Sequence, residues 1–150
     1  MKNTITILML SISTLFFAQK KSNNKIFEVI ENVPVYKGCN KNDTNKELTE
    51  CMTQKIAELI SKNFNTGIAY EIGLQDGLVE IQVIFKINSH GEVTDIKCTG
   101  PHSRLEEEAK RVISLIPNME RPALQKGKAI NVPYVFPIQF IVGNTRIKKK

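Results

Sequence analysis

The sequence predicts an α+β fold of two layers, in which a three-stranded antiparallel sheet carries two helices on one face. Apolar residues recur at three- and four-residue steps in two segments, which is typical of amphipathic helices. Between these segments, apolar and polar residues alternate strictly, which is typical of a half-buried strand. The expected order is helix, strand, strand, helix, strand, and the short connections favour antiparallel pairing.

The first helix is expected over residues 47–64. Thr44, followed three residues later by Glu47, is the pattern of a capping box at a helix start. The residues of its apolar stripe are Leu48, Met52, Ile56, Leu59, Ile60 and Phe64. A short helical turn, closed by Gly73, is expected to follow over residues 68–72.

The first two strands are expected over residues 77–87 and 93–99, joined by a turn that contains Gly91. The inward-facing residues of the first strand are Val79, Ile81, Val83, Phe85 and Ile87. One face therefore meets a core and the other meets water, as is usual in antiparallel sheets. The apolar residues of the return strand change phase near its start, which predicts a β-bulge at residues 94–95.

The second helix is expected to begin at Ser103, which forms a second capping-box pattern with Glu106, and to stop at Pro117. Its apolar stripe consists of Leu105, Ala109, Val112, Ile113 and Ile116. A basic loop over residues 121–128 then leads to a final strand over residues 130–142.

The N-terminal segment has the pattern of a secretory signal peptide. Lys2 supplies a positive charge, an apolar run follows, and Ala18 precedes a polar stretch. As a helix the apolar run spans ~21 Å, which is short of the ~30 Å core of a bilayer. We therefore expect no stable membrane insertion once this leader is cleaved. The expected organisation is a signal peptide (1–18), an N-terminal arm (19–46), the folded domain (47–143) and a basic tail (144–150).

The chain contains three cysteines, and export places them in an oxidising compartment. Cys39 and Cys51 flank one polar stretch, so we expect them to form a disulfide. Cys98 lies in an expected strand, where it serves as a small apolar residue. The alternative is three unpaired thiols.

The residues give little support to catalysis, metal binding or nucleic-acid binding. His90 and His102 lack a zinc-ligand spacing with the cysteines, and the acidic run 106–108 suits the start of a helix. Cys98 as a nucleophile would need a neighbouring base. The net charge of +6 lies partly at the chain ends. Aromatic residues make up 7% of the chain and Trp is absent, so few side chains are available to stack on nucleic-acid bases. We expect no enzyme, no cofactor and no nucleic-acid partner.

The combined spacing of several short motifs resembles the C-terminal domain of TonB-family energy transducers over about residues 51–142. The motifs are Ala69-x3-Gly73-x3-Gly77-x-Val79-x-Ile81-x-Val83-x-Phe85-x-Ile87-x3-Gly91-x-Val93, then Gly100-Pro101-His102, and finally Val132-Pro133-x3-Pro137-Ile138-x-Phe140. The stretch Val35-Tyr36-x-Gly38-Cys39, together with Cys51, also resembles a variant of the family with paired cysteines.

In that family the domain lies in the periplasm of Gram-negative bacteria and grips a short peptide, the TonB box, of outer-membrane transporters. The peptide binds largely by adding to the sheet as a further strand. The resemblance therefore implies a periplasmic peptide-binding module that acts in or modulates TonB-dependent transport. The chain differs from the family in lacking a long Pro-rich spacer and in having Asn65-Thr66 where the family has Tyr-Pro.

These differences leave two alternative functions open. The chain is then either a short energy transducer, anchored in the membrane by an uncleaved N-terminal segment, or a secreted structural or adhesion protein that reuses the fold.

The last strand is the expected binding edge. Successive N–H groups of a strand alternate between its two edges, and Pro133 and Pro137 are four residues apart, so both missing donors fall on one edge. That outer edge regains donors at Gln139 and Ile141. A partner peptide, or a second copy in a homodimer, is expected to pair with Ile138, Gln139, Phe140, Ile141 and Val142. The alternative is that the prolines merely protect an edge that binds nothing.

Overall fold

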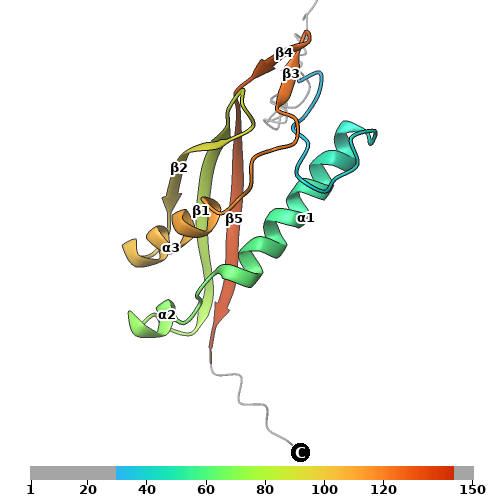
Figure 1. The fold of residues 1–150 in the computed structure, drawn as a ribbon. Coiled ribbons are helices and arrows are strands. Elements are labelled where there is room, and N and C mark those ends of the chain that lie inside the picture. The colour runs from blue at the N-terminus through green and yellow to red at the C-terminus, as the bar shows by residue number, and fades with distance from the viewer. Residues whose placement is uncertain (1–29, 144–150) are drawn as a thin grey trace, which may run out of the picture.

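The computed structural model describes residues 30–143, so the expected signal peptide, the first part of the arm and the basic tail lie outside the described residues. One antiparallel sheet has the strand order β2 (Val93–Thr99), β1 (Gly77–Ile87) and β5 (Val132–Val142). Two long helices cover one face of this sheet (Figure 1). The two-layer α+β fold predicted from the sequence is confirmed.

The first helix, α1 (Asn45–Asn63), begins with the expected capping box. The backbone N–H of Glu47 donates to the Thr44 hydroxyl over 3.3 Å, and the Thr44 N–H donates to the Glu47 carboxylate over 2.8 Å. Its buried residues are Leu48, Met52, Ile56 and Ile60. These residues pack on the sheet because they share one side of the helix. A single turn, α2 (Ile68–Glu71), follows.

The central strand β1 pairs with β5 without interruption, from Gly77 opposite Val142 to Ile87 opposite Val132. Its odd-numbered residues from Val79 onward are buried, and its even-numbered residues are exposed. The pairing with β2 shifts register between Ile84 and Lys86, and Asp95 has a φ of 53° there. The expected β-bulge is therefore confirmed.

The start of the second long helix, α3 (Ser103–Ile113), differs from the sequence prediction. The N-cap is His102, whose ring Nδ1 accepts a hydrogen bond from the Arg104 N–H over 3.1 Å. Ser103 is already helical, so its hydroxyl does not cap the helix. The Glu106 carboxylate instead accepts from the N–H of Gly100 over 2.9 Å, which ties the helix to the end of β2.

A small hairpin replaces the loop expected over residues 121–128. The strands β3 (Ala123–Gln125) and β4 (Lys128–Ile130) are joined by Lys126 and Gly127, with φ angles of 50° and 70°. Two successive positive φ angles close a two-residue hairpin turn whose twist matches that of its strands. The prediction of one strand from residue 130 was therefore wrong: a separate strand, β5, begins at Val132.

The segment 30–36 packs against this hairpin. The N–H of Val35 donates to the carbonyl of Arg121 over 2.9 Å, and Asn32 forms a bridge with Leu124. The buried residues of the segment include Ile30, Val33, Val35 and Tyr36. This part of the expected arm therefore contributes to the core.

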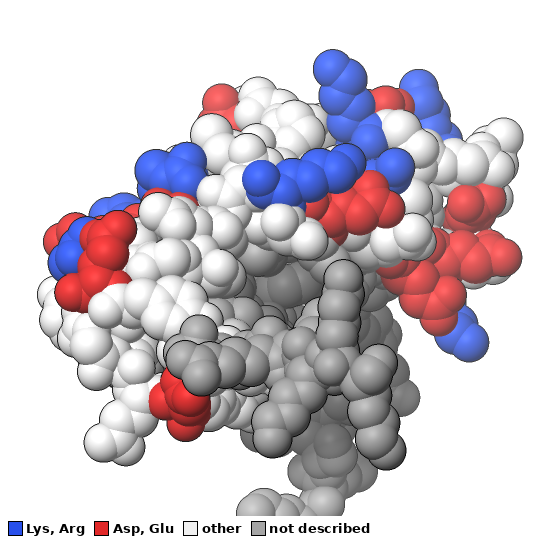
Figure 2. All heavy atoms as spheres, turned by 90° about the horizontal axis from the view of Figure 1, so that it is seen from below, with Lys and Arg blue, Asp and Glu red and all other residues white. Residues whose placement is uncertain are grey.

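Charged side chains of both signs lie next to one another on the end of the molecule where β5 finishes (Figure 2). The Arg104 guanidinium pairs with the Glu71 carboxylate at 2.5 Å. This view shows no large surface of a single sign. Within residues 30–143, no helix has both the length and the apolar character needed to cross a membrane.

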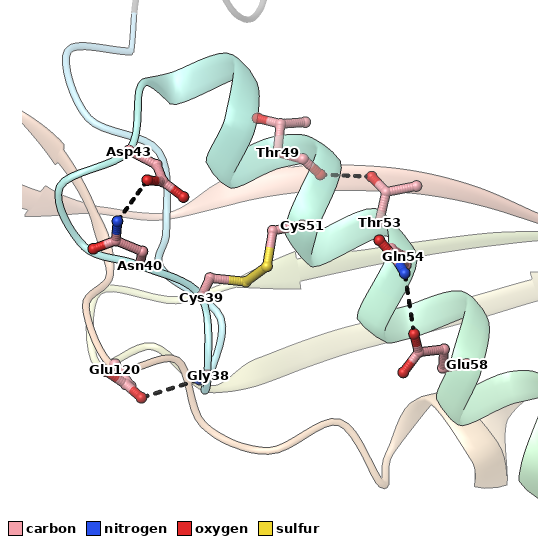
Figure 3. The surroundings of a disulfide bond; sticks show 10 residues. All are labelled: Gly38, Cys39, Asn40, Asp43, Thr49, Cys51, Thr53, Gln54, Glu58 and Glu120. Atoms are coloured by element: carbon pink, nitrogen blue, oxygen red, sulfur yellow. Dashed lines mark hydrogen bonds between the residues drawn. A yellow bond between two sulfur atoms is a disulfide. The ribbon is translucent and has the colours of Figure 1, made fainter.

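Cys39 and Cys51 form a disulfide that joins the loop before α1 to the second turn of that helix (Figure 3). Their Cα atoms are 6.1 Å apart. The loop is also held by a bond from the Gly38 N–H to the Glu120 carboxylate, over 3.1 Å. Cys98 is free and half-buried, and burial raises the pKa of its thiol, which keeps it protonated at neutral pH.

Candidate functional site

The outer edge of β5 is one of the two open edges of the sheet, because within residues 30–143 β5 pairs with β1 alone and β2 forms the other edge. Pro133 and Pro137 both sit inside the unbroken ladder with β1 although neither has an N–H to donate. A continuous ladder accommodates both prolines when their backbone nitrogens face away from β1. Gln139 and Ile141 are an even number of residues from the two prolines, so their backbone groups face the same way. Each of them therefore has an N–H and a C=O that point to the outer edge.

The end of this edge is held by Tyr70 of α2. The Tyr70 hydroxyl donates to the carbonyl of Gly143 over 3.1 Å and lies 3.3 Å from the Gly143 N–H. Both main-chain groups of Gly143 therefore already have a partner. The stretch with free pairing capacity ends at Ile141.

A groove of about 430 Å³ lies between the C-terminal half of α1 and this part of β5. Its lining residues are Ala57, Ile60, Ser61, Phe64, Thr66, Phe136, Pro137, Ile138, Gln139 and Phe140. None of them is charged. The rings of Phe64 and Phe140 meet with their centroids 5.5 Å apart, so an aromatic pair joins the helix wall to the strand wall.

The helix wall of the groove is held in place by Glu108 of α3. Its carboxylate accepts from the Asn65 N–H over 2.9 Å and from two guanidinium nitrogens of Arg111, both over 2.7 Å. Arg111 also donates to the Asn63 carbonyl over 2.8 Å. These bonds satisfy main-chain groups at the C-terminal end of α1, and thereby fix where α1 lies relative to the sheet.

Hydrogen bonding by Arg111 holds the pKa of the Glu108 carboxyl below its usual value of 4.5, although burial acts in the opposite direction. Glu108 is therefore ionised at neutral pH. Its side chain is 9% exposed, whereas that of Arg111 is 52% exposed, so the pair sits at the edge of the core. The sequence interpretation of residues 106–108 as helix-dipole groups missed this tertiary role.

The open face of the sheet carries apolar residues as well. Leu78 lies opposite Ile141, and Ile84 lies opposite Val135. All four side chains are exposed, with Ile141 at 79%. Between these pairs the Gln139 amide donates to the Glu80 carboxylate over 2.7 Å, which fixes the Gln139 side chain on this face.

The other residues that the sequence analysis considered for catalysis or metal binding lie away from this edge. His90 lies in the turn between β1 and β2, and His102 caps α3. Cys98 belongs to β2, at the opposite side of the sheet from β5. Within the described part of the chain, no three His, Cys, Asp or Glu side chains are grouped so that they could hold a metal ion.

Three of the residues predicted for peptide binding, Ile138, Gln139 and Phe140, line the strand wall of the groove, whereas no residue of the helix wall was predicted as part of the site. Ala57 and Ser61 are exposed residues of α1, and neither belongs to the apolar stripe that marks the core side. Their positions four residues apart on one flank are visible in the sequence. Nothing in the sequence indicates that this flank faces the edge of β5.

Comparison with known proteins identifies one family model over this region. The model described as Gram-negative bacterial TonB protein C-terminal matches residues 75–142, a span that includes all of β1 and β5. A search of solved structures finds the NMR solution structure of Helicobacter pylori TonB-CTD, at 24% sequence identity and a TM-score of 0.40. That match covers 69% of this chain and 88% of the other. No curated protein matches the chain.

Proposed function

We propose that the chain is a peptide-binding module of TonB-dependent transport across the outer membrane, because residues 75–142 match the family model described as Gram-negative bacterial TonB protein C-terminal. The proposed ligand is a peptide segment of an outer-membrane transporter. It pairs as an added strand with the outer edge of β5, over residues 138–142. The observation that carries this proposal is that Gln139 and Ile141, whose main-chain groups face the unpaired edge of β5, lie beside an apolar groove.

Strand addition suits this edge because main-chain groups supply the affinity and an adjacent groove receives alternate side chains. Each hydrogen bond to an added strand contributes about 1 kcal/mol net. An edge with consecutive donors and acceptors at residues 139 and 141 offers four such groups. The proposal assigns the chain a binding role, which agrees with a family that is a transport module rather than a known class of enzyme.

We place the protein in the periplasm. The disulfide between Cys39 and Cys51 supports this location, since structural disulfides form and persist in oxidising compartments. The signal-peptide pattern of residues 1–18 supports export, and under this proposal the domain extends to residue 143, followed by the basic tail.

The intact mass of the protein isolated from its native cells tests whether the signal peptide is cleaved. We expect a mass that lacks residues 1–18, because the apolar run is short for a membrane span and ends in a small residue before a polar stretch. Retention of these residues would instead favour the membrane-anchored transducer.

Replacing Gln139 with proline tests the strand pairing. The Gln139→Pro variant loses one outer-edge donor, so its affinity for TonB-box peptides of outer-membrane transporters is expected to fall by about 1 kcal/mol or more. Isothermal titration with synthetic peptides from the transporters of the same genome measures this change.

Two matched variants separate the backbone effect from other effects. Gln139→Ala removes the side-chain bond to Glu80 but keeps the N–H, and should bind nearly as well as the parent protein. Val135→Pro removes an outer-edge donor outside the proposed site and should also leave affinity unchanged. Unchanged affinity in a folded Gln139→Pro variant would show that the partner binds elsewhere.

A further inference from the structure

We infer that the groove between α1 and β5 selects the peptide by sequence, accepting uncharged apolar side chains at the two positions that flank the residue paired with Gln139. This inference rests on the proposed strand pairing and names the class of peptide that the pairing takes. Main-chain hydrogen bonds are the same for every sequence, so discrimination must come from the side chains. The groove is the part of the site that side chains of the added strand reach.

The alternation of side chains assigns each peptide position to a face. Gln139 points to the open face of the sheet, where it bonds Glu80. A peptide residue opposite Gln139 therefore points to the open face too, because paired residues share a face. Its two neighbours lie opposite Ile138 and Phe140 and point to the helix side. They enter the groove that those two residues line with α1.

The limits of free pairing fix this register. Pro137 offers no donor on one side of Gln139, and beyond Ile141 the main-chain groups of Gly143 are held by Tyr70. The stretch with a donor and an acceptor at each outward-facing residue is therefore Gln139 to Ile141. A peptide that makes the most bonds centres on this stretch. The side chains opposite Ile138 and Phe140 are consequently the ones that the groove receives.

The chemistry of the walls explains why these side chains should be apolar. Phe64 and Phe140 are only partly buried, and they pack against the edge of the core. A side chain placed against this ring pair covers more of both rings and removes apolar surface from water. The lining contains no charged residue, so a carboxylate or an ammonium group would lose water there without gaining an oppositely charged partner.

Ser61 offers a way to change this selectivity without disturbing the core. It is an exposed residue of α1 and lines the groove. Ser61→Glu introduces a carboxylate at the helix wall. Gln54→Glu makes the same change of charge at another exposed position of α1, which does not line the groove. The two variants differ in whether the new charge reaches the proposed selective surface.

Selection from a phage-displayed library of random nonapeptides, on the oxidised protein and the two variants, tests the inference. The parent protein and Gln54→Glu should both select peptides with apolar residues at positions i and i+2 and without charges there. Ser61→Glu should select Lys or Arg at one of these positions. Peptides selected on the parent protein should bind Ser61→Glu about tenfold more weakly or worse.

Amide hydrogen exchange separates the failure of this inference from the failure of the proposed function. Peptides that protect the amides of Gln139 and Ile141, but show the same composition on the parent protein and Ser61→Glu, would overturn the selective role of the groove alone. If no selected peptide protects those amides, strand pairing at β5 is wrong and the groove inference is wrong with it. Protection together with the switch to Lys or Arg supports both.

Discussion

Replacement of Cys39 and Cys51 by serine is expected to lower the free energy of unfolding by about 3 kcal/mol. The disulfide spans a sequence separation of 12 residues, and breaking it restores to the unfolded chain the conformations that the closed loop forbids. The folded state also loses a covalent link between the loop at Cys39 and helix α1. The loss is large for a domain of this size, since such domains are stable by only about 5–15 kcal/mol in total.

Urea denaturation of the oxidised protein, the reduced protein and the double serine variant measures this effect. The reduced protein and the double variant should unfold at similar, lower urea concentrations. Cys98→Ser is the control, because Cys98 takes no part in the bond and should cause a much smaller change. Coincident transitions for the oxidised protein and the double variant would contradict the prediction.

The loss of the disulfide should also destabilise some parts of the chain more than others. The amide of Val35 bonds across to Arg121 in a segment that the disulfide holds close to α1. We expect its hydrogen exchange to accelerate more than that of the central strand β1, whose pairing is independent of the bond.

Glu108→Ala should lower the free energy of unfolding by about 2 kcal/mol. The variant leaves the Asn65 N–H without its acceptor and removes the carboxylate that orients Arg111. It also opens space at the junction of α1 and α3. Glu107→Ala, one residue earlier on the exposed side of α3, is the matched control and should change stability little. Equal unfolding midpoints for the two variants would contradict the structural role of Glu108.

The contribution of Glu108 should depend on pH in a defined direction. Its pKa in the folded protein is lowered below 4.5, mainly by the hydrogen bonds from Arg111. Its stabilising effect is therefore fully present above that ordinary value, and it is lost as the pH falls through the lowered pKa of the folded state. The difference in stability between the parent protein and Glu108→Gln should narrow below about pH 4.5. Denaturation of both proteins at a series of pH values measures this difference. A difference in stability that grows as the pH falls would contradict the predicted direction.

Local patterns in the sequence predicted those elements whose signals are themselves local. The capping box at Thr44 and the alternation in β1 need no distant partner to be recognised. The hairpin of β3 and β4 was missed because its strands have three residues each, too few for alternation to be visible. Its one local signal is Gly127 after Lys126, the two residues of its turn.

The burial of residues 30–36 was missed for a different reason. This segment reads as a polar arm with short apolar patches, and its partners Arg121 and Leu124 lie far along the chain. The same limit applies to the candidate site. The spacing of Pro133 and Pro137 predicts an outward edge, but the groove requires α1 to lie beside that edge. That placement depends on the hydrogen bond between Glu108 of α3 and Asn65, which follows the end of α1, and no local pattern encodes this contact.

The disulfide also determines how the domain bears mechanical tension. A pull on the chain ahead of Ile30 reaches the domain through the short segment that bridges to β3, and those few bonds can be peeled one after another. At Cys39 the load crosses the sulfur bridge directly to Cys51, within α1 (Figure 3). The loop between them and the first turn of α1, with its capping residue Thr44, then carry no load. In the oxidised protein, unravelling from this end therefore stops before it reaches the capped start of the helix.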